Sequence, residues 1–411
     1  MHKKMLGMLL AGALMGSLLA GCGDGAQTGG DSGNTPSQEQ GNDSQDGAGD
    51  EGQADDGAQG DEGAQGDEGA QAGGDAYIIA ANTWGAGAYP LDDIVRNDQY
   101  LCDQLGLTLD VANNEFTADK VVSQLENQLA NNPNAVLFLG MAETTFVPVV
   151  QAIDNKGIPY AFDSNFPGDQ LMEKCIEDAL CCGGVAAAPY DMGKAIAELA
   201  IADGHKTAVI TAAAQGDYSH DNRILGFTET FEAAGGEVVQ VSHSADPSEA
   251  VAKTNDLLTA NPDVDCVYAT GGDYLSAAVS IKEQRSDLKC ALYGTDVDPS
   301  LIPAIQNGSV SAMNGGQGVC GSLALTLLIN YLDGHQILDA DGKAPFFVNL
   351  NPFIITAENA DGFQKMYDAG ENFVGMENFN KLLFRNNPDV SFDTYNEVLE
   401  GYAESVYSRL Q

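Results

Sequence analysis

Polar and aromatic side chains gather directly after the predicted β-strands of this sequence. The set combines carboxylates, amides, one guanidinium group and aromatic rings: Asn82, Trp84, Tyr89, Asp163, Asn165, Arg223, Asp273, Asp296 and Asn314. Carboxylates, amides and guanidinium groups pair well with hydroxyl groups, which both donate and accept hydrogen bonds. Aromatic rings pack against the apolar face of a sugar ring. The set therefore indicates recognition of a hydroxyl-rich small molecule, and Glu143, Gln317 and His220 are weaker candidates.

Several of these candidates also have an ordinary structural explanation, which the sequence leaves open. Trp84 is the only tryptophan, and it could fill a hydrophobic core instead of contacting a ligand. Asp273 and Asp296 lie near the starts of predicted helices, where a carboxylate can cap free backbone N–H groups. His220 could simply be a solvated loop residue. The sequence alone therefore predicts a set of site residues but not which of them take part.

The positions of these residues depend on an alternation of short apolar runs and longer amphipathic runs from residue 76 onward. Strands are expected at 77–82, 107–111, 135–139, 160–163, 207–210, 237–242, 266–269, 291–294, 310–313 and 346–356. Helices are expected at 91–105, 118–131, 145–156, 191–203, 223–234, 247–260, 275–283, 299–307, 321–332 and 394–410. This alternation predicts an α/β fold whose parallel sheets carry helices on both faces. Ligands of such sheets bind beyond the carboxyl ends of the strands, where the polar set lies.

The predicted elements are too many for one such sheet. They divide into two units of similar size near residues 182–189, where Gly183-Gly184 and the alanines at 186–188 indicate a crossing or hinge. We therefore expect two doubly wound parallel-sheet lobes joined by a hinge.

The N-terminal part of the chain differs in character from the rest. A short basic start and an apolar run end in Leu18-Leu19-Ala20-Gly21-Cys22, which resembles the lipobox of bacterial lipoproteins. This resemblance implies a signal peptide at 1–22, cleavage before Cys22 and lipidation of its thiol. Residues 23–75 are rich in Gly, Asp, Glu and Gln and contain no aromatic residue, Lys or Arg. Such a composition predicts a disordered acidic tether.

Charge and cysteine content exclude further classes. A formal net charge of −42 argues against nucleic acid and against an anionic membrane surface as partners. Beyond Cys22 there are seven cysteines, an odd number, so at least one is a free thiol or pairs between chains. A bridge from Cys175 to Cys181 or Cys182 stays open. Neither the cysteines nor the five histidines show the paired spacing of a metal site, so no metal is expected.

Enzymatic alternatives find little support in the motifs. Gly85-Ala86-Gly87 follows the first strand as in dinucleotide-binding proteins, but Pro90 rather than a third glycine closes the turn. Neither a phosphate-binding Gly-x-x-x-x-Gly-Lys-Ser/Thr loop nor a Gly-x-Ser-x-Gly nucleophile motif occurs. We therefore expect no enzymatic activity, no catalytic residue and no cofactor.

Five segments over residues 76–370 together resemble type I periplasmic binding proteins of the ribose- and galactose-binding kind. They are the loop from Asn82 to Tyr89, the strand 159–163, Asn222-Arg223-Ile224-Leu225-Gly226-Phe227, the segment from Asn261-Pro262-Asp263-Val264 to Asp273, and Gly294-Thr295-Asp296. The resemblance implies a first lobe of 76–188 plus about 316–350 and a second of 189–315 plus about 351–411. It also implies that Asp163, Arg223 and Asp296 bind sugar hydroxyls. Ser164, Gly140, Gly271 and Gly315 depart from the ribose-type pattern, so a larger sugar such as a hexose or disaccharide is a hypothesis.

The resemblance implies a function without chemistry. We expect a monomeric lipoprotein, anchored to the cell membrane through Cys22 on the extracytoplasmic side, that captures a sugar and delivers it to an ABC permease. The same scaffold could instead present its ligand to a membrane receptor as a sensor subunit. A nucleoside or amino acid is the alternative ligand, and Arg223 with Asp163 or Asp296 would supply the paired charges that an amino acid needs.

Overall fold

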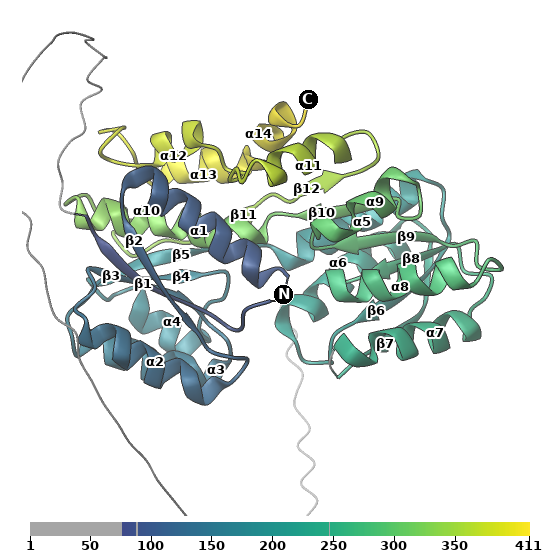
Figure 1. The fold of residues 1–411 in the computed structure, drawn as a ribbon, viewed down its shortest axis with the longest axis horizontal. Helices are drawn as coiled ribbons and strands as arrows, with labels where there is room; N and C mark the ends of the chain where they lie inside the picture. The colour runs from purple at the N-terminus through teal and green to yellow at the C-terminus, as the bar shows by residue number, and fades with distance from the viewer. Residues whose placement is uncertain (1–75, 88, 246) are drawn as a thin grey trace, which may run out of the picture. The chain divides into compact units, whose positions relative to one another are not determined.

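The computed structural model describes residues 76–411, apart from residues 88 and 246. The expected signal peptide at 1–22, its Cys22 and the tether at 23–75 lie outside the described residues. Among the residues described, no helix is both long and apolar enough to cross a membrane. Two sheets, each with helices on both faces, organise this part of the chain (Figure 1).

The first sheet has the strand order β11-β5-β4-β3-β1-β2, and all its neighbouring strands are parallel. Its strands are β1 (Ile78–Thr83), β2 (Thr108–Asn113), β3 (Ala135–Leu139), β4 (Tyr160–Asp163), β5 (Cys181–Ala187) and β11 (Phe346–Leu350). Helices α1 (Leu91–Leu105) and α10 (Cys320–Leu332) cover one face, and α2 (Ala118–Ala130), α3 (Glu143–Asp154) and α4 (Asp169–Cys175) cover the other. We call this sheet with its helices the first lobe.

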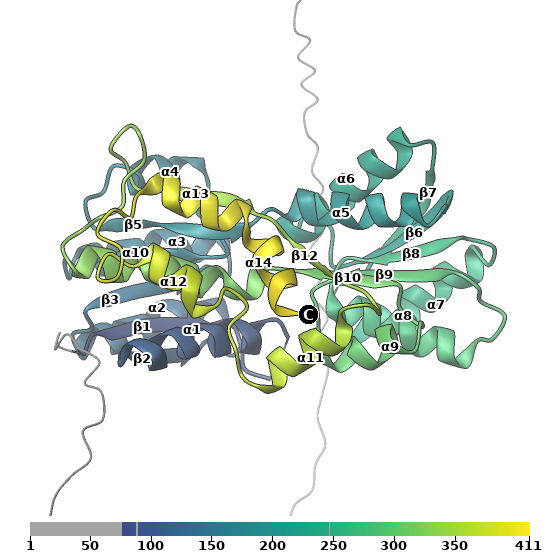
Figure 2. The ribbon, with the colours of Figure 1, turned by 90° about the horizontal axis from the view of Figure 1, so that it is seen from above.

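The second sheet has the order β12-β10-β9-β8-β6-β7, in which only β12 runs antiparallel to its neighbour. Its strands are β6 (Thr207–Ala212), β7 (Glu237–His243), β8 (Cys266–Ala269), β9 (Ala291–Thr295), β10 (Ala312–Gly315) and β12 (Phe353–Ile355). Helices α5 (Pro189–Ala202) and α6 (Tyr218–Ala233) lie on one face, and α7 (Ala250–Ala260), α8 (Gly272–Gln284) and α9 (Ile302–Gln306) lie on the other (Figure 2). We call this sheet with its helices the second lobe.

Burial accounts for the apolar sequences of the central parallel strands. Every residue of β3, Ala-Val-Leu-Phe-Leu, is buried, and so is every residue of β8. A strand covered by helices on both faces needs apolar side chains at successive positions rather than at alternate ones. The α/β fold with two doubly wound sheets, as predicted from the sequence, is thereby confirmed.

Two predicted segments near the lobe crossings need correction. The division near 182–189 agrees with the structure, since α5 of the second lobe starts at Pro189, but residues 181–187 form strand β5 of the first sheet, which was not expected. Gly183 adopts φ +96° within this strand. A Cβ at Gly183 would lie 1.9 Å from the Pro345 carbonyl oxygen, so only glycine allows β11 to approach β5. The run at 346–356 forms two strands in different sheets, β11 and β12, since Asn351 and Pro352 separate them.

Four helices complete the chain: α11 (Ala360–Asp368), α12 (Met376–Leu382), α13 (Phe392–Glu400) and α14 (Tyr402–Arg409). The expected helix at 394–410 is thus two helices, with Gly401 between them. Helices α12 and α13 contact α10 and β11 of the first lobe, whereas α11 and α14 contact α9 and β12 of the second. The expected assignment of all of 351–411 to the second lobe does not agree with these contacts. The other lobe boundaries stay a prediction.

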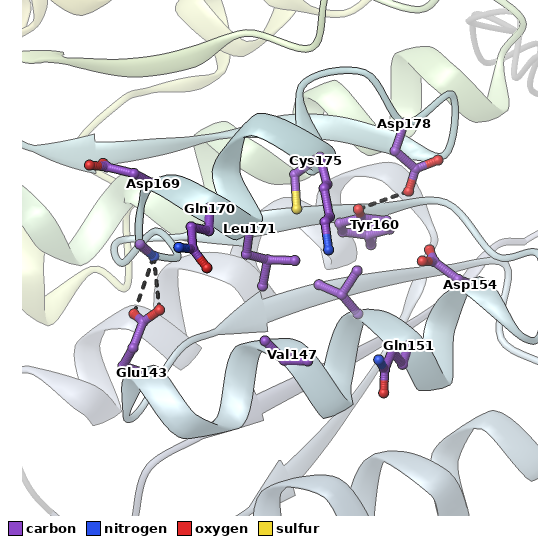
Figure 3. Close-up of a pocket in the computed structure, with 13 residues that line it drawn as sticks. Glu143, Val147, Gln151, Asp154, Tyr160, Asp169, Gln170, Leu171, Cys175 and Asp178 are labelled. Carbon is purple, nitrogen blue, oxygen red and sulfur yellow. Dashed lines mark hydrogen bonds between the residues drawn. The ribbon is translucent and has the colours of Figure 1, made fainter.

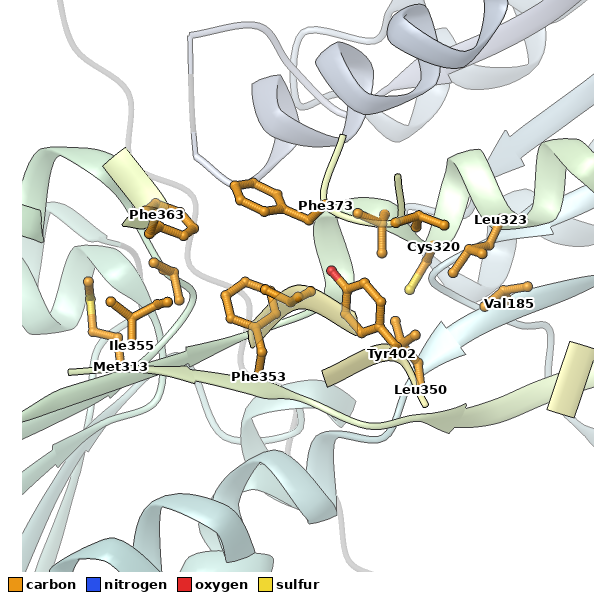
Figure 4. Packing of buried hydrophobic residues seen from close by; sticks show 14 of the residues in the cluster. Val185, Met313, Cys320, Leu323, Leu350, Phe353, Ile355, Phe363, Phe373 and Tyr402 are labelled. Atoms are coloured by element: carbon orange, nitrogen blue, oxygen red, sulfur yellow. The ribbon is translucent and has the colours of Figure 1, made fainter. Parts of the chain in front are cut away.

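An aromatic cluster joins these helices to the core (Figure 4). The Phe363 and Phe373 rings stack with centroids 4.9 Å apart, and Phe353 lies 5.8 Å from Phe373 and 6.0 Å from Tyr402. All four rings are buried, so each contributes about 1.5–3 kcal/mol of apolar burial. The packing of these rings holds the C-terminal segment against the part of the chain that connects β11 to β12.

The seven cysteines of the described residues are all buried and carry free thiols. The alternative of a bridge from Cys175 to Cys181 or Cys182 is therefore not formed in this structure.

Candidate ligand-binding site

Three predicted residues of the first lobe converge at the carboxyl end of β3. Trp84 donates from Nε1 to the Gly140 carbonyl at 3.2 Å, and Asn165 donates from Nδ2 to the same oxygen at 2.9 Å. Asn82 exchanges two hydrogen bonds with the backbone of Leu139, at 2.9 and 3.0 Å. The loops after β1 and β4 are thus fixed to the end of β3, as expected for parallel strands that end at one edge.

These bonds also limit what each side chain can offer. The amide of Asn82 also donates to Asn114 Oδ1 at 2.9 Å, so its hydrogen-bonding groups are engaged within the lobe. Trp84 packs against Leu91, Ile94 and Leu139 but is only half-buried. The structure thus gives Asn82 a positioning role and leaves Trp84 available for contact.

Arg223 and Asp296 of the second lobe are buried and form a polar cluster with Gln317, which follows β10 and is partly buried. Arg223 Nη2 lies 3.2 Å from Asp296 Oδ1 and donates to Gln317 Oε1, while Gln317 Nε2 donates to Asp296 Oδ1. Arg223 Nη1 donates to the Thr270 carbonyl at 2.6 Å. Burial raises the pKa of Asp296, and the Arg223 charge opposes this shift. Arg223 Nε has no partner, so this cluster retains a free donor.

Tyr89 reaches this cluster from the first lobe. Its hydroxyl donates to the Val297 carbonyl at 2.5 Å. Burial, followed by the charges of Asp93 and Asp296, raises the pKa of Tyr89 well above its ordinary value. The cavity that Tyr89, Asp296 and Gln317 help to line measures ≈ 20 Å³, room for about one water molecule. The two lobes therefore meet here with their polar groups in mutual contact.

Asp163 and Asn314 do not join the Arg223 cluster. Asp163 is 2% exposed and lies against the start of α10, where a Cβ at Gly321 would be 2.7 Å from its Oδ2 and 2.6 Å from both carboxylate oxygens of Asp98. Burial raises the pKa of Asp163 to about 7. Asn314 is fully buried and donates to the Met192 carbonyl at 2.7 Å, which ties β10 to α5.

Asp273 lies at the exposed start of α8, at the edge of the Arg223 cluster. Partial burial and then the carboxylates of Asp298 and Asp296 raise the pKa of Asp273. Among the weaker candidates, Glu143 accepts from the Gly168 backbone N–H at 3.1 Å. His220 meets Thr270 Oγ1 at 2.7 Å, and burial lowers the pKa of His220 to about 4.

Gln317 was only a weaker candidate in the sequence, and Asp98 was not among the predicted site residues. Gln317 was one of several polar residues after one strand, and only its contacts distinguish it from Asn314. Asp98 had a usable signal, since it shares a helical face with Ile94, Leu101 and Cys102, which are apolar and buried. A carboxylate on such a face predicts a buried acid.

Comparison with protein families agrees with this geometry. Residues 99–336 match the family described as periplasmic binding protein domain, which is more than half of the chain. The chain belongs to this family. The matched residues run from within α1 to just beyond α10, and thus include most of both sheets. Membership implies an extracytoplasmic location, as the sequence predicted.

Solved structures of periplasmic binding proteins share the fold. A galactofuranose binding protein superposes with a TM-score of 0.60 at 15% identity, over 72% of this chain and 99% of that one. The binding protein of the arabinose ABC transporter from Shewanella sp. ANA-3, bound to L-arabinofuranose, gives 0.61 at 16% identity, over 71% and 97%. A glucose-galactose binding protein from Geobacillus stearothermophilus gives 0.57 at 20% identity, over 69% and 99%.

The expected type I periplasmic binding protein fold is thus confirmed. No curated protein matches this sequence.

A larger pocket of this periplasmic binding domain lies elsewhere. It has a volume of ≈ 560 Å³ and lies between α3 and α4, with Tyr160, Cys175 and Asp178 in its wall (Figure 3). Of the nine residues predicted to bind ligand, none lines it. All residues that line this pocket belong to the first lobe, whereas the Arg223 cluster faces Tyr89 of the other lobe, so the Arg223 cluster and the facing loops of the first lobe are the candidate ligand site.

Proposed function

We propose that this protein is an extracytoplasmic solute-binding lipoprotein that captures a sugar between its lobes and delivers it to an ABC importer. The observation that carries the proposal is the Arg223–Asp296–Gln317 cluster, which Tyr89 faces from the other lobe. Structural neighbours that bind galactofuranose and arabinofuranose support a sugar as the ligand. The lipobox ending at Cys22 supports lipid anchoring.

The polar contacts between the lobes suggest how binding would work. In this structure Tyr89 donates to a backbone carbonyl of the second lobe, and Gln317 uses its amide on Asp296. Sugar hydroxyls can both donate and accept, so a sugar could replace these contacts when the lobes separate and close around it. A ligand that bridges both lobes favours the closed state in proportion to its extra contacts there. No covalent step is required.

The charge of the site favours an uncharged sugar over an amino acid. The guanidinium of Arg223 is already paired with Asp296, and Asp93 is paired with Arg96 at 2.8 Å. Asp273 and Asp298 add negative charge nearby. An amino acid would need a free cation for its carboxylate, and this site offers none among the described residues.

Calorimetric titration of the full chain with L-arabinose, D-galactose, D-glucose, D-ribose, uridine and L-serine would test the ligand class. We expect saturable binding of at least one sugar, and loss of that affinity by about 10- to 150-fold in Arg223→Ala, since hydrogen bonds to a charged group contribute about 1.5–3 kcal/mol. Arg385→Ala is the matched control, because Arg385 also pairs with an aspartate, Asp333, far from the site. Binding of uridine or serine with no sugar bound would refute the assignment.

Lipid anchoring needs a separate test. Wild-type protein should partition into detergent in a phase-separation assay of whole cells, whereas Cys22→Ser should stay in the aqueous phase. Delivery to an importer is tested by uptake of the labelled sugar in cells that lack the gene. Normal uptake there would point instead to a sensor.

A further inference from the structure

Phe116 lies next to the first-lobe ligand loop, and its surroundings are unusual. We infer that its ring is a further ligand-contact residue, a platform on which the apolar face of the bound sugar stacks. This inference rests on the proposed function and adds a residue to the same site.

The backbone around Phe116 is held in an unfavourable conformation. Glu115 and Phe116 adopt φ values of 50° and 54°, the left-handed region that residues with a bulky side chain seldom enter. Such positions cost about 1–3 kcal/mol each and persist only where surrounding bonds enforce them. Here Phe116 N donates to the Trp84 carbonyl at 2.5 Å, and Glu115 N donates to Asn113 Oδ1 at 3.0 Å. The turn after β2 is therefore fastened to the loop that carries Trp84.

This turn places the ring over Gly85. A Cβ at Gly85 would lie 2.1–2.5 Å from three carbons of the Phe116 ring, so only glycine leaves room for it. Yet the side chain of Phe116 is 55% exposed, which makes it one of the most exposed large apolar residues of the described chain. Burial of the Phe116 ring in the core therefore does not offset the backbone strain.

The position of Phe116 in the first sheet indicates what binds to its ring. Trp84 and Gly85 follow β1, and Phe116 follows the adjacent β2, so all three lie beyond the carboxyl ends of neighbouring parallel strands. This is where open α/β sheets bind their ligands. The C–H face of a furanose or pyranose ring packs well on an aromatic ring. An exposed ring at this edge therefore fits a sugar better than a hydrophobic partner protein.

The test uses the full chain and the sugar that wild-type protein binds most tightly among L-arabinose, D-galactose, D-glucose and D-ribose. Phe116→Ala should weaken Kd about 5- to 10-fold, Phe116→Leu should lie in between, and Phe116→Trp should keep near wild-type affinity. Val348→Ala is the control, because Val348 is also 55% exposed but lies on β11. The melting temperature of Phe116→Ala should match that of the control.

A second variant tests the geometry directly. Gly85→Ala should displace the ring and weaken Kd in the wild-type background but change it little in Phe116→Ala. Equal Kd values for wild type, Phe116→Ala and Phe116→Leu would overturn the inference while leaving the proposed function intact. If Phe116→Ala keeps the wild-type Kd but cells that carry it lose sugar uptake, the inference is overturned and Phe116 contacts the permease instead. If wild-type protein binds no sugar in this panel, the proposed function fails first and the role of Phe116 fails with it.

Discussion

Asp98 and Asp163 are two buried carboxyl groups that face each other across Gly321. Neither forms an ion pair within the described part of the chain, and Asp98 Oδ1 has no hydrogen-bond partner. Burial, and then the charge of Asp163, raises the pKa of Asp98 well above its ordinary value. Two such carboxylates cannot both ionise cheaply in a low-dielectric interior, so we expect the pair to retain a proton near neutral pH.

This pair predicts the direction in which stability changes with pH. The folded pKa of Asp163 is about 7, raised above the value of about 3.9 expected in the unfolded chain. The unfolded state therefore loses its proton first, and this stabilising contribution is full below about pH 4 and is lost as pH rises through 7. Between pH 5 and pH 8, the unfolding free energy of wild-type protein should therefore fall. In Asp98→Asn this fall should be smaller, by up to about 3 kcal/mol. Urea denaturation of both proteins at pH 5 and pH 8 would measure this difference. Identical losses of unfolding free energy in the two proteins would contradict the shared proton.

Substitution of Gln317 should affect sugar affinity, whereas substitution of Asn314 should affect the stability of the fold. Gln317 contacts Arg223 and Asp296, whereas Asn314 holds the Met192 carbonyl. We expect Gln317→Ala to weaken sugar binding by about 10-fold with little change in melting temperature. Asn314→Ala should lower unfolding free energy by about 1–3 kcal/mol, since it leaves a buried carbonyl unpaired. Calorimetry and thermal unfolding of both variants would check this, and the reverse pattern would exchange their roles.

At the scale of elements, the first sheet depends on how closely β11 approaches β5. Gly183 combines a φ of +96° with a backbone carbonyl where its Cβ would be. Gly183→Ala should therefore cost several kcal/mol, in the range of about 3–5 kcal/mol that marks severe core disruption. Gly204→Ala is the matched control, with φ +88° and open space around it, and should cost only about 1 kcal/mol. Equal losses by denaturant unfolding would show that close approach is unimportant.

The C-terminal helices illustrate a limit of element prediction. Arg96 of α1 donates to the Glu371 carbonyl at 3.0 Å and stacks over Tyr367 at 4.7 Å. Tyr395 of α13 stacks on Phe347 of β11 with centroids 5.3 Å apart. These contacts join residues that are 48 or more positions apart, so local periodicity could predict the helix at 394–410 but not the lobe that the C-terminal helices cover.

At the scale of the whole molecule, the negative net charge of the protein should favour neutral sugars over anionic ones. The chain has a net charge of −42, and the cations nearest the site, Arg223 and Arg96, are both paired with aspartates. An anionic sugar would enter a field of like charge that is screened only partly at physiological salt. We expect D-glucuronate and D-galacturonate to bind at least about 10-fold more weakly than the corresponding neutral hexoses. Competition titrations at low and high salt would measure this, and stronger binding of a uronate would contradict it.

The sequence by itself determined the alternation of strands and helices, the two-lobed α/β fold and the strand ends at which ligand residues gather. These features follow from local periodicity and from residue types beside each strand, which the chain carries whatever its partners. The tertiary structure alone decided that Gln317 rather than Asn314 joins Arg223, that Asp163 and Asp98 both lie beside Gly321, and that Phe116 lies over Gly85. Each of these contacts joins elements distant in sequence, so it depends on how helices and sheets pack rather than on any local pattern.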